Sequence, residues 1–289
     1  MIMAPNITHY ISVFSMLICF SFLSHSQVGI NTTSPEGVLD VSSTNSGIVF
    51  PRVALTARNV STPVVNPNTG GAPVNGTYVF NTTTTSTGTN DVYPGLYVWY
   101  NNEWVAQFQK TDSKVFEQTN RGAEGLRTVN GVNAIPGFVN ETFTPKFSGT
   151  YKVEIIVNYG GGFAKEAETE ARTDVTNLNY GLSHRHTFDR SHNVVSQEGQ
   201  FTFTFNGTEY NVYANSYSTY NSGQRYYAIW FQTSYILYLD LVSGTDYNFN
   251  MIFNQFENVK IQNNGNSGDG RGYIGVHVPC YAEFNFISD

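Results

Sequence analysis

Cysteine and positive charge are the scarcest features of this 289-residue chain, which has 2 cysteines and 15 basic against 22 acidic residues. The net charge of −7 argues against nucleic acid and anionic membranes as partners, because clustered Lys and Arg bind both. Only Cys280 follows the first 26 residues, so no disulfide can form within the remainder. Charged residues make up only 13%, yet 40% hydrophobic residues are too many for a disordered chain.

The first 26 residues lack any charged side chain and contain an apolar run over residues 11–23. A transmembrane helix needs about 20 apolar residues, and this run is shorter. Small residues precede Gln27, as a signal peptidase requires. We therefore expect 1–26 to be a cleaved signal peptide, with an exported mature chain that does not insert into a membrane. An N-terminal anchor helix is the alternative.

The remaining composition favours strands over helices. Gly, Tyr and Phe number 26, 19 and 21, and Asn and Thr are abundant. Gly and Asn destabilise helix interiors, whereas aromatic and β-branched side chains suit a pleated sheet. Apolar residues alternate with polar ones in several segments, which predicts one-sided strands. These sets are 151, 153, 155, 157 and 159; 201, 203 and 205; 237, 239 and 241; 247, 249, 251 and 253; and every second residue from 274 to 286.

The pattern predicts an all-β protein in two parts. Residues 27–109 read as a small N-terminal β module with a hairpin that turns at Asn101-Asn102. Residues 110–135 are more polar and read as a neck, and residues 136–289 read as a sandwich or jelly roll. Cys280 falls in the apolar stripe of the last strand and is expected in the core. Residues 164–172 have alanines at helical spacing, and the sequence leaves their structure open.

Two segments carry candidate chemistry. His184 and His186 would share one face of a strand and could bind a metal ion, with Asp189 or His192 completing the site. The alternative is an exposed polar hairpin. The segment 263–272, NNGNSGDGRG, could supply a serine nucleophile, a dinucleotide loop or Ca²⁺ ligands, but a turn between strands explains it more simply. We expect no enzyme and no cofactor.

Aromatic residues are densest in residues 210–231. We predict that they bind a surface protein or a glycan, because aromatic side chains with a polar tip are favoured at interfaces. The alternative is that many of them form the core. The residues predicted to contact the partner are Tyr217, Tyr220, Tyr226 and Tyr227, with Trp230 beside them.

The opening stretch VGINTTSP followed by LDV, with GIVFPRVALT and PGLYVWYNNEWV after it, resembles the N-terminal part of exported bacterial surface proteins. Such segments are typical of surface proteins in bacteria that use the type IX secretion system, and of phage tail-fibre-like proteins. The resemblance covers about residues 28–108. It implies a fibrous, often trimeric assembly outside the cell and no particular reaction.

A second resemblance covers about residues 136–289. FTPKFSGTYKVEIIV and YLDLVSGTDYNF are similar to segments of C1q/TNF-like jelly rolls, although Thr245 adds one residue between Gly244 and Asp246. The resemblance implies a homotrimer formed through aromatic-lined jelly-roll faces.

Together these features predict a non-enzymatic exported surface protein that forms a homotrimer. It would act in adhesion or recognition, or as a structural or accessory subunit of a secretion or gliding apparatus. The alternative function is a carbohydrate-binding module or a glycan hydrolase, since paired carboxylates on distant strands leave no sequence signature.

Overall fold

The computed structural model describes most of the chain and divides it into two units, Met1–Pro51 and Arg52–Asp289. The residues described are 11–12, 14–15, 27–86, 88–120, 125–128, 131–164, 193–221, 224–265, 267–276 and 278–289. No helix in these ranges is long and apolar enough to cross a membrane.

The first unit contains one pair of strands, β1 (Val28–Ile30) and β2 (Leu39–Val41), which are parallel. Residues 11–12 and 14–15, in the predicted signal peptide, are helical.

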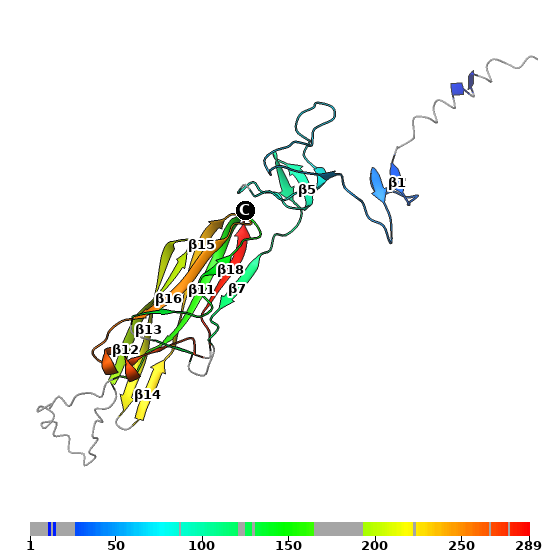
Figure 1. Ribbon diagram of the computed structural model, residues 1–289. Helices are drawn as coiled ribbons and strands as arrows, with labels where there is room; N and C mark the ends of the chain where they lie inside the picture. The colour runs from blue at the N-terminus through cyan, green and yellow to red at the C-terminus, as the bar shows by residue number, and fades with distance from the viewer. Residues whose placement is uncertain are drawn as a thin grey trace, which may run out of the picture. The chain divides into compact units, whose positions relative to one another are not determined.

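The second unit begins with a four-stranded sheet around β5, here called the small sheet (Figure 1). Its strand order is β3-β4-β5-β6. Its strands are β3 (Arg52–Val53), β4 (Thr77–Asn81), β5 (Gly95–Tyr100) and β6 (Glu103–Ala106). The predicted hairpin is confirmed: Asn101 and Asn102 have φ values of 51° and 64° between β5 and β6. Asn tolerates this conformation, and two such residues make the type I′ turn that suits twisted strands.

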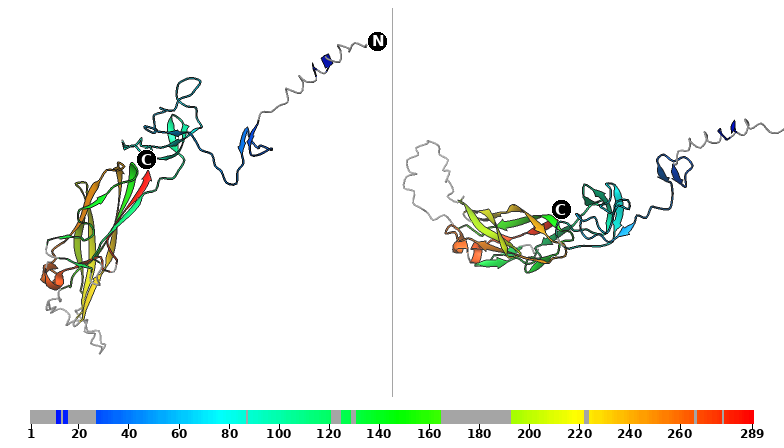
Figure 2. Two further views of the ribbon diagram at one scale, coloured as in Figure 1. Left: turned by 45° about the vertical axis from the view of Figure 1, so that its right-hand side comes forward. Right: turned by 90° about the horizontal axis from the view of Figure 1, so that it is seen from above.

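The rest of the second unit is a sandwich of two six-stranded sheets, which confirms the all-β prediction (Figures 1 and 2). One sheet has the order β10-β16-β12-β13-β14, with β9 beside β16. The other has the order β7-β18-β11-β17-β8, with β15 beside β11. Strands β14 to β17 alternate between the two sheets, whereas β12, β13 and β14 follow one another within one sheet.

The bounds of the sandwich strands are as follows. The first sheet contains β9 (Val132–Ala134), β10 (Glu141–Phe143), β12 (Asn193–Phe205), β13 (Thr208–Asn221), β14 (Gln224–Ile229) and β16 (Tyr247–Gln255). The second contains β7 (Ser113–Glu117), β8 (Leu126–Arg127), β11 (Gly149–Gly160), β15 (Phe231–Leu241), β17 (Tyr273–Ile274) and β18 (Tyr281–Ser288).

The core lies between the two sheets and is rich in aromatic rings. Phe143 stacks on Phe284 with ring centroids 4.2 Å apart, and Phe116 meets Phe249 edge-on at 4.7 Å. Cys280 is buried in this core, as the sequence predicts.

Two details differ from the sequence prediction. The predicted neck, residues 110–135, contributes β7, β8 and β9 to the sandwich, and Phe116 enters the core. The continuous last strand predicted over 274–286 is wrong, because the chain leaves the sheet between β17 and β18. Gly275 there has φ 65°, and Val278 is exposed.

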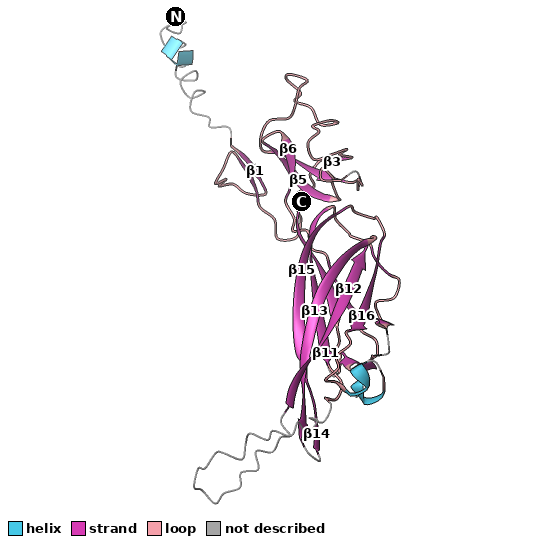
Figure 3. Cartoon of the chain, turned by 90° about the vertical axis from the view of Figure 1, so that its left-hand side faces the viewer, coloured by secondary structure: helices cyan, strands magenta, loops and turns pink. Residues whose placement is uncertain are grey.

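Two short turns, η2 (Gln262–Gly265) and η3 (Gly268–Gly270), lie between β16 and β17 (Figure 3). In η2, Asn263 and Asn264 have φ values of 51° and 54°, so the backbone there is left-handed. Both turns agree with the interpretation of segment 263–272 as a turn between strands. Of the undecided segment 164–172, only Ala164 is described, and it pairs with Ile261 in an isolated β-bridge.

Candidate self-association surface

The parallel pair β1–β2 is held by local hydrogen bonds. Asn31, at φ 57°, ends β1, and its side-chain amide donates to the Ser42 carbonyl at 2.9 Å. Around it, the Val28 amide donates to the Val38 carbonyl and the Asp40 carboxylate accepts from the Glu36 amide. These bonds shape the segment without giving it a core.

Apolar side chains of this segment are exposed to solvent. Val28 is 50% exposed and Val49 79%. None of the residues 27–51 belongs to a hydrophobic core cluster of the described chain. Single exposed apolar residues are ordinary, but a run of them usually marks an interaction site. The exposed set is Val28, Ile30, Val38, Leu39, Val41, Ile48 and Val49.

The small sheet has a packed inner face. Trp99 and Trp104 face each other across the hairpin with ring centroids 5.0 Å apart, and the Trp104 indole N–H donates to the Val60 carbonyl at 3.0 Å. Asn81, at the opposite end of β4 from the residue that pairs with Trp99, is fully buried and bonds to the backbone of Leu55 and Tyr93. The cluster comprises Leu55, Val79, Val92, Tyr97, Trp99 and Trp104.

The opposite face of the small sheet is apolar as well, and we call it the outer face. Strand register places Tyr78 beside Val98 and Val98 beside Val105, which forms one row across β4, β5 and β6. Its apolar residues are Tyr78, Phe80, Leu96, Val98, Tyr100 and Val105, all exposed or half-buried. Register adds one charged residue on each edge strand, Arg52 beside Phe80 and Glu103 beside Tyr100. A sheet with one face in water normally alternates apolar and polar residues. This one does not, so its outer face is suited to a partner.

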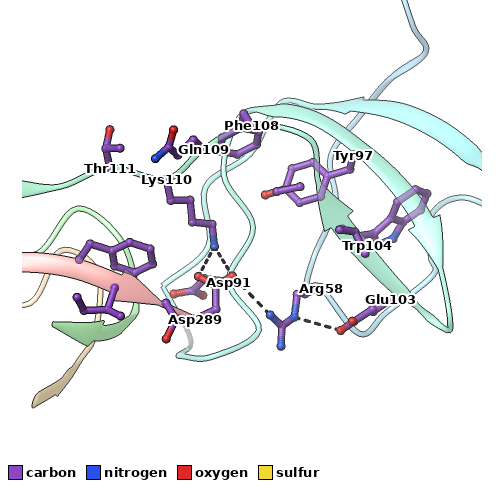
Figure 4. Close-up of a pocket in the computed structure, with 15 residues that line it drawn as sticks. Arg58, Asp91, Tyr97, Glu103, Trp104, Phe108, Gln109, Lys110, Thr111 and Asp289 are labelled. Carbon is purple, nitrogen blue, oxygen red and sulfur yellow. Dashed lines mark hydrogen bonds and ion pairs between the residues drawn. The ribbon is translucent and has the colours of Figure 1, made fainter. Parts of the chain in front are cut away.

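A cleft of about 460 Å³ lies where the small sheet meets the sandwich, and charged groups line it (Figure 4). Lys110, whose side chain is 10% exposed, pairs with Asp289 at 2.7 Å. Arg58 lies within 3.4 Å of Glu103 and 3.5 Å of Asp289. Burial raises the pKa of Tyr97, on the cleft wall, to about 12. These acidic and basic groups form ion pairs with one another and hold the small sheet against the sandwich. We call this contact the joint.

The predicted metal ligands His184 and His186, with Asp189 and His192, lie outside the described residues. In the described part of the chain, no three His, Cys, Asp or Glu side chains come close enough to hold a metal ion. The His184/His186 site stays a prediction.

The predicted tyrosine cluster is only partly described. Tyr217 is half-buried and meets Phe231 edge-on at 5.4 Å. Backbone register places Tyr217 opposite Ile229, Thr219 opposite Tyr226 and Tyr220 opposite Arg225. The side chains of Tyr220, Tyr226 and Tyr227 lie outside the described part, so their role as a binding site stays a prediction.

The sequence predicts Trp230 beside this cluster but not the residues that surround it. Register aligns Gly160, Tyr273 and Arg127 across β11, β17 and β8. The Trp230 indole lies over Gly160, where a Cβ atom would come within 2.6 Å of it, and its ring is 6.2 Å from that of Tyr273. Trp230 is 36% exposed. The four residues come from separate segments, so the sequence gives no signal for the group.

A signal for the outer face does exist in the sequence. TYVFN and GLYVWY carry apolar residues at both odd and even positions, which is typical of a strand covered on both faces.

A protein-family model described as "Phage tail like trimerisation region" matches residues 29–121. No curated protein matches the chain. The match supports a homotrimeric, tail-fibre-like structural protein, in agreement with the resemblance of residues 28–108. Of the sandwich strands it covers β7 alone, so the resemblance to C1q/TNF-like domains stays a prediction.

Proposed function

We propose that this chain is a non-enzymatic, exported, homotrimeric surface protein that displays its sandwich for adhesion or recognition. One observation carries the proposal. The region that matches the trimerisation model, 29–121, contains a dense set of apolar side chains that one copy leaves in contact with water, Ile30, Leu39 and Tyr100 among them. Burial of apolar surface is the main force of protein association, so further copies would cover these side chains.

A trimer would suit recognition at a cell surface. Three linked sandwiches can engage three sites at once, and the second and third contacts then form at high effective concentration. The fixed joint between the small sheet and the sandwich would hold these copies in a common orientation. The same arrangement fits a structural or accessory subunit of a secretion or gliding apparatus.

The mass of residues 27–289 in solution tests the proposal. Light scattering on a sizing column should give a mass near three chains. A monomer at micromolar concentration would overturn the proposal. Cell fractionation of the full chain tests export separately: the protein should lose residues 1–26 and be recovered outside the cytoplasm.

A glycan-binding role is the second candidate function, and the Trp230 group favours it. The exposed indole lies beside Tyr273, and the Arg127 guanidinium stacks on the Tyr273 ring at 5.8 Å. Arg127 is anchored by a hydrogen bond to the Gly268 carbonyl at 2.6 Å. Flat aromatic rings can pack against the C–H face of a sugar ring while the guanidinium donates to its hydroxyls.

A glycan array, followed by titration calorimetry, would test this role. Trp230→Ala should abolish binding of any oligosaccharide that the wild type retains. Tyr238→Ala is the matched control, since Tyr238 is an exposed aromatic residue elsewhere on the sandwich. A chain that binds no glycan, or one whose binding survives Trp230→Ala, would remove this candidate.

A further inference from the structure

We infer that the outer faces of three small sheets pack against one another around a threefold axis, with Val98 nearest that axis. The inference rests on the proposed function, because it names the surface through which the copies associate. The occupant of each face is the same face of the two other copies.

The outer face has the composition of a buried surface. Its central row consists of Tyr78, Val98 and Val105, and no charged side chain interrupts this row. Leu96 and Phe80 form the next row, which ends at Arg52 on the edge strand β3. The charged residues of this face, Arg52 and Glu103, lie on the edge strands β3 and β6, and Glu103 is paired with Arg58. Burial of the central row would therefore remove apolar area from water without placing a charge at the axis.

The arrangement of sizes also fits a threefold contact. The β-branched Val98 occupies the centre of the middle row, and larger rings surround it at Tyr78, Phe80 and Tyr100. The small Val98 side chain lets three sheets approach closely at an axis, and the larger rings around it can then reach across to neighbouring copies. Tyr100, beside the hairpin turn, is 61% exposed and would gain most from such cover.

The small sheet lies in the part of the chain that matches the trimerisation-region model. β3, β4, β5 and β6 all lie within residues 29–121. Within a single copy, the side chains of Phe80 and Tyr100 are each at least 40% exposed. The inner face is already filled by Trp99 and Trp104, which leaves the outer face as the surface of this sheet available to other copies.

Replacement of Val98 by glutamate tests the inference. Three carboxylates brought together at the axis would repel one another, so Val98→Glu should reduce the mass from three chains to one. Tyr238→Glu, which adds the same charge at an exposed position of the sandwich, should leave the mass at three chains. A trimeric Val98→Glu variant would overturn the inference and leave the proposed function intact. A monomeric wild type would overturn both.

Cysteine cross-linking keeps the test valid if Val98→Glu fails to fold. Tyr78→Cys places a thiol on the outer face, and the mature chain otherwise contains only the buried Cys280. Mild oxidation should join pairs of Tyr78→Cys chains into reducible dimers, whereas Tyr238→Cys should remain monomeric on the gel. Equal yields of dimer from the two variants would contradict a contact at this face.

Discussion

Asp91, in the loop before β5, accepts a hydrogen bond from the hydroxyl of Ser148, which directly precedes β11. The other carboxylate oxygen accepts from the Thr85 hydroxyl at 2.9 Å. Ser148 in turn accepts from the backbone amide of Ser243 at 2.9 Å. Asp91 and Ser148 are both buried, so a single carboxylate ties the small sheet to two loops of the sandwich.

Replacement of Asp91 by alanine should therefore weaken the joint. The variant leaves the Ser148 and Thr85 hydroxyls without this acceptor, and hydrogen bonds to charged groups contribute about 1.5–3 kcal/mol. We expect the free energy of unfolding in urea to fall by about that amount. Trp99 and Trp104 report on the small sheet, so tryptophan fluorescence should show it unfolding earlier.

Asp240→Ala provides the control, because Asp240 accepts a similar bond from Thr150 in an exposed position. Exposed polar contacts contribute little, so this variant should lose less than about 1 kcal/mol. Equal losses for Asp91→Ala and Asp240→Ala would show that the joint does not depend on the buried carboxylate.

Asn81 should be the most sensitive polar residue of the small sheet. Its side chain accepts from the Leu55 amide at 3.0 Å and donates to the carbonyls of Thr83 and Tyr93. Asn81→Ala would leave these buried groups unpaired, at a cost of about 1–3 kcal/mol for each. Thermal unfolding should show a large fall in Tm, with Asn75→Ala, an exposed asparagine that accepts one backbone bond, near wild type.

The sequence predicts strands well where one face is buried. Phe201, Phe203 and Phe205 all enter the core, as their alternation requires. The hairpin at Asn101-Asn102 is predicted equally well, because two adjacent residues determine its turn.

Long-range relationships cannot be predicted in this way. Asp91 and Ser148 are 57 residues apart, and no local pattern indicates that they meet. The row of Gly160, Tyr273 and Arg127 depends on the register of three strands from different parts of the chain. The alternation predicts too long a last strand, because apolar residues keep the same parity from β17 to β18 across a segment that leaves the sheet.

Gly160 should tolerate no side chain without movement of Trp230. A Cβ atom at this position would lie 2.6 Å from the indole, well inside van der Waals contact. Gly160→Ala should displace the ring and lower the stability by about 1–3 kcal/mol, as overpacking usually does. Gly47→Ala is the control, because no atom lies within 4 Å of the place that its methyl group would occupy. Unchanged fluorescence and stability in Gly160→Ala would contradict this contact.

Cys280 should make the fold less stable in alkaline solution. Burial raises the pKa of its thiol to about 12, although its sulfur accepts a bond from the Asn158 amide at 3.4 Å. The unfolded thiol ionises near its ordinary value of about 8.5. The unfolded state therefore binds fewer protons than the folded state between these values, and stability falls as pH rises through that window.

Two measurements check the role of Cys280. Tm of the wild type should fall between about pH 8 and 10, because the pKa of an unfolded thiol is about 8.5. The fall should be smaller in Cys280→Ala. The cavity in Cys280→Ala also lowers Tm by an amount that does not depend on pH. The two effects are separated by comparing the slopes of Tm against pH in the two proteins. A thiol reagent at about pH 8 should label the wild type only after unfolding, because the nucleophilic thiolate is absent from the folded core. Rapid labelling of the native protein would show that the thiol is accessible and would contradict its place between the two sheets.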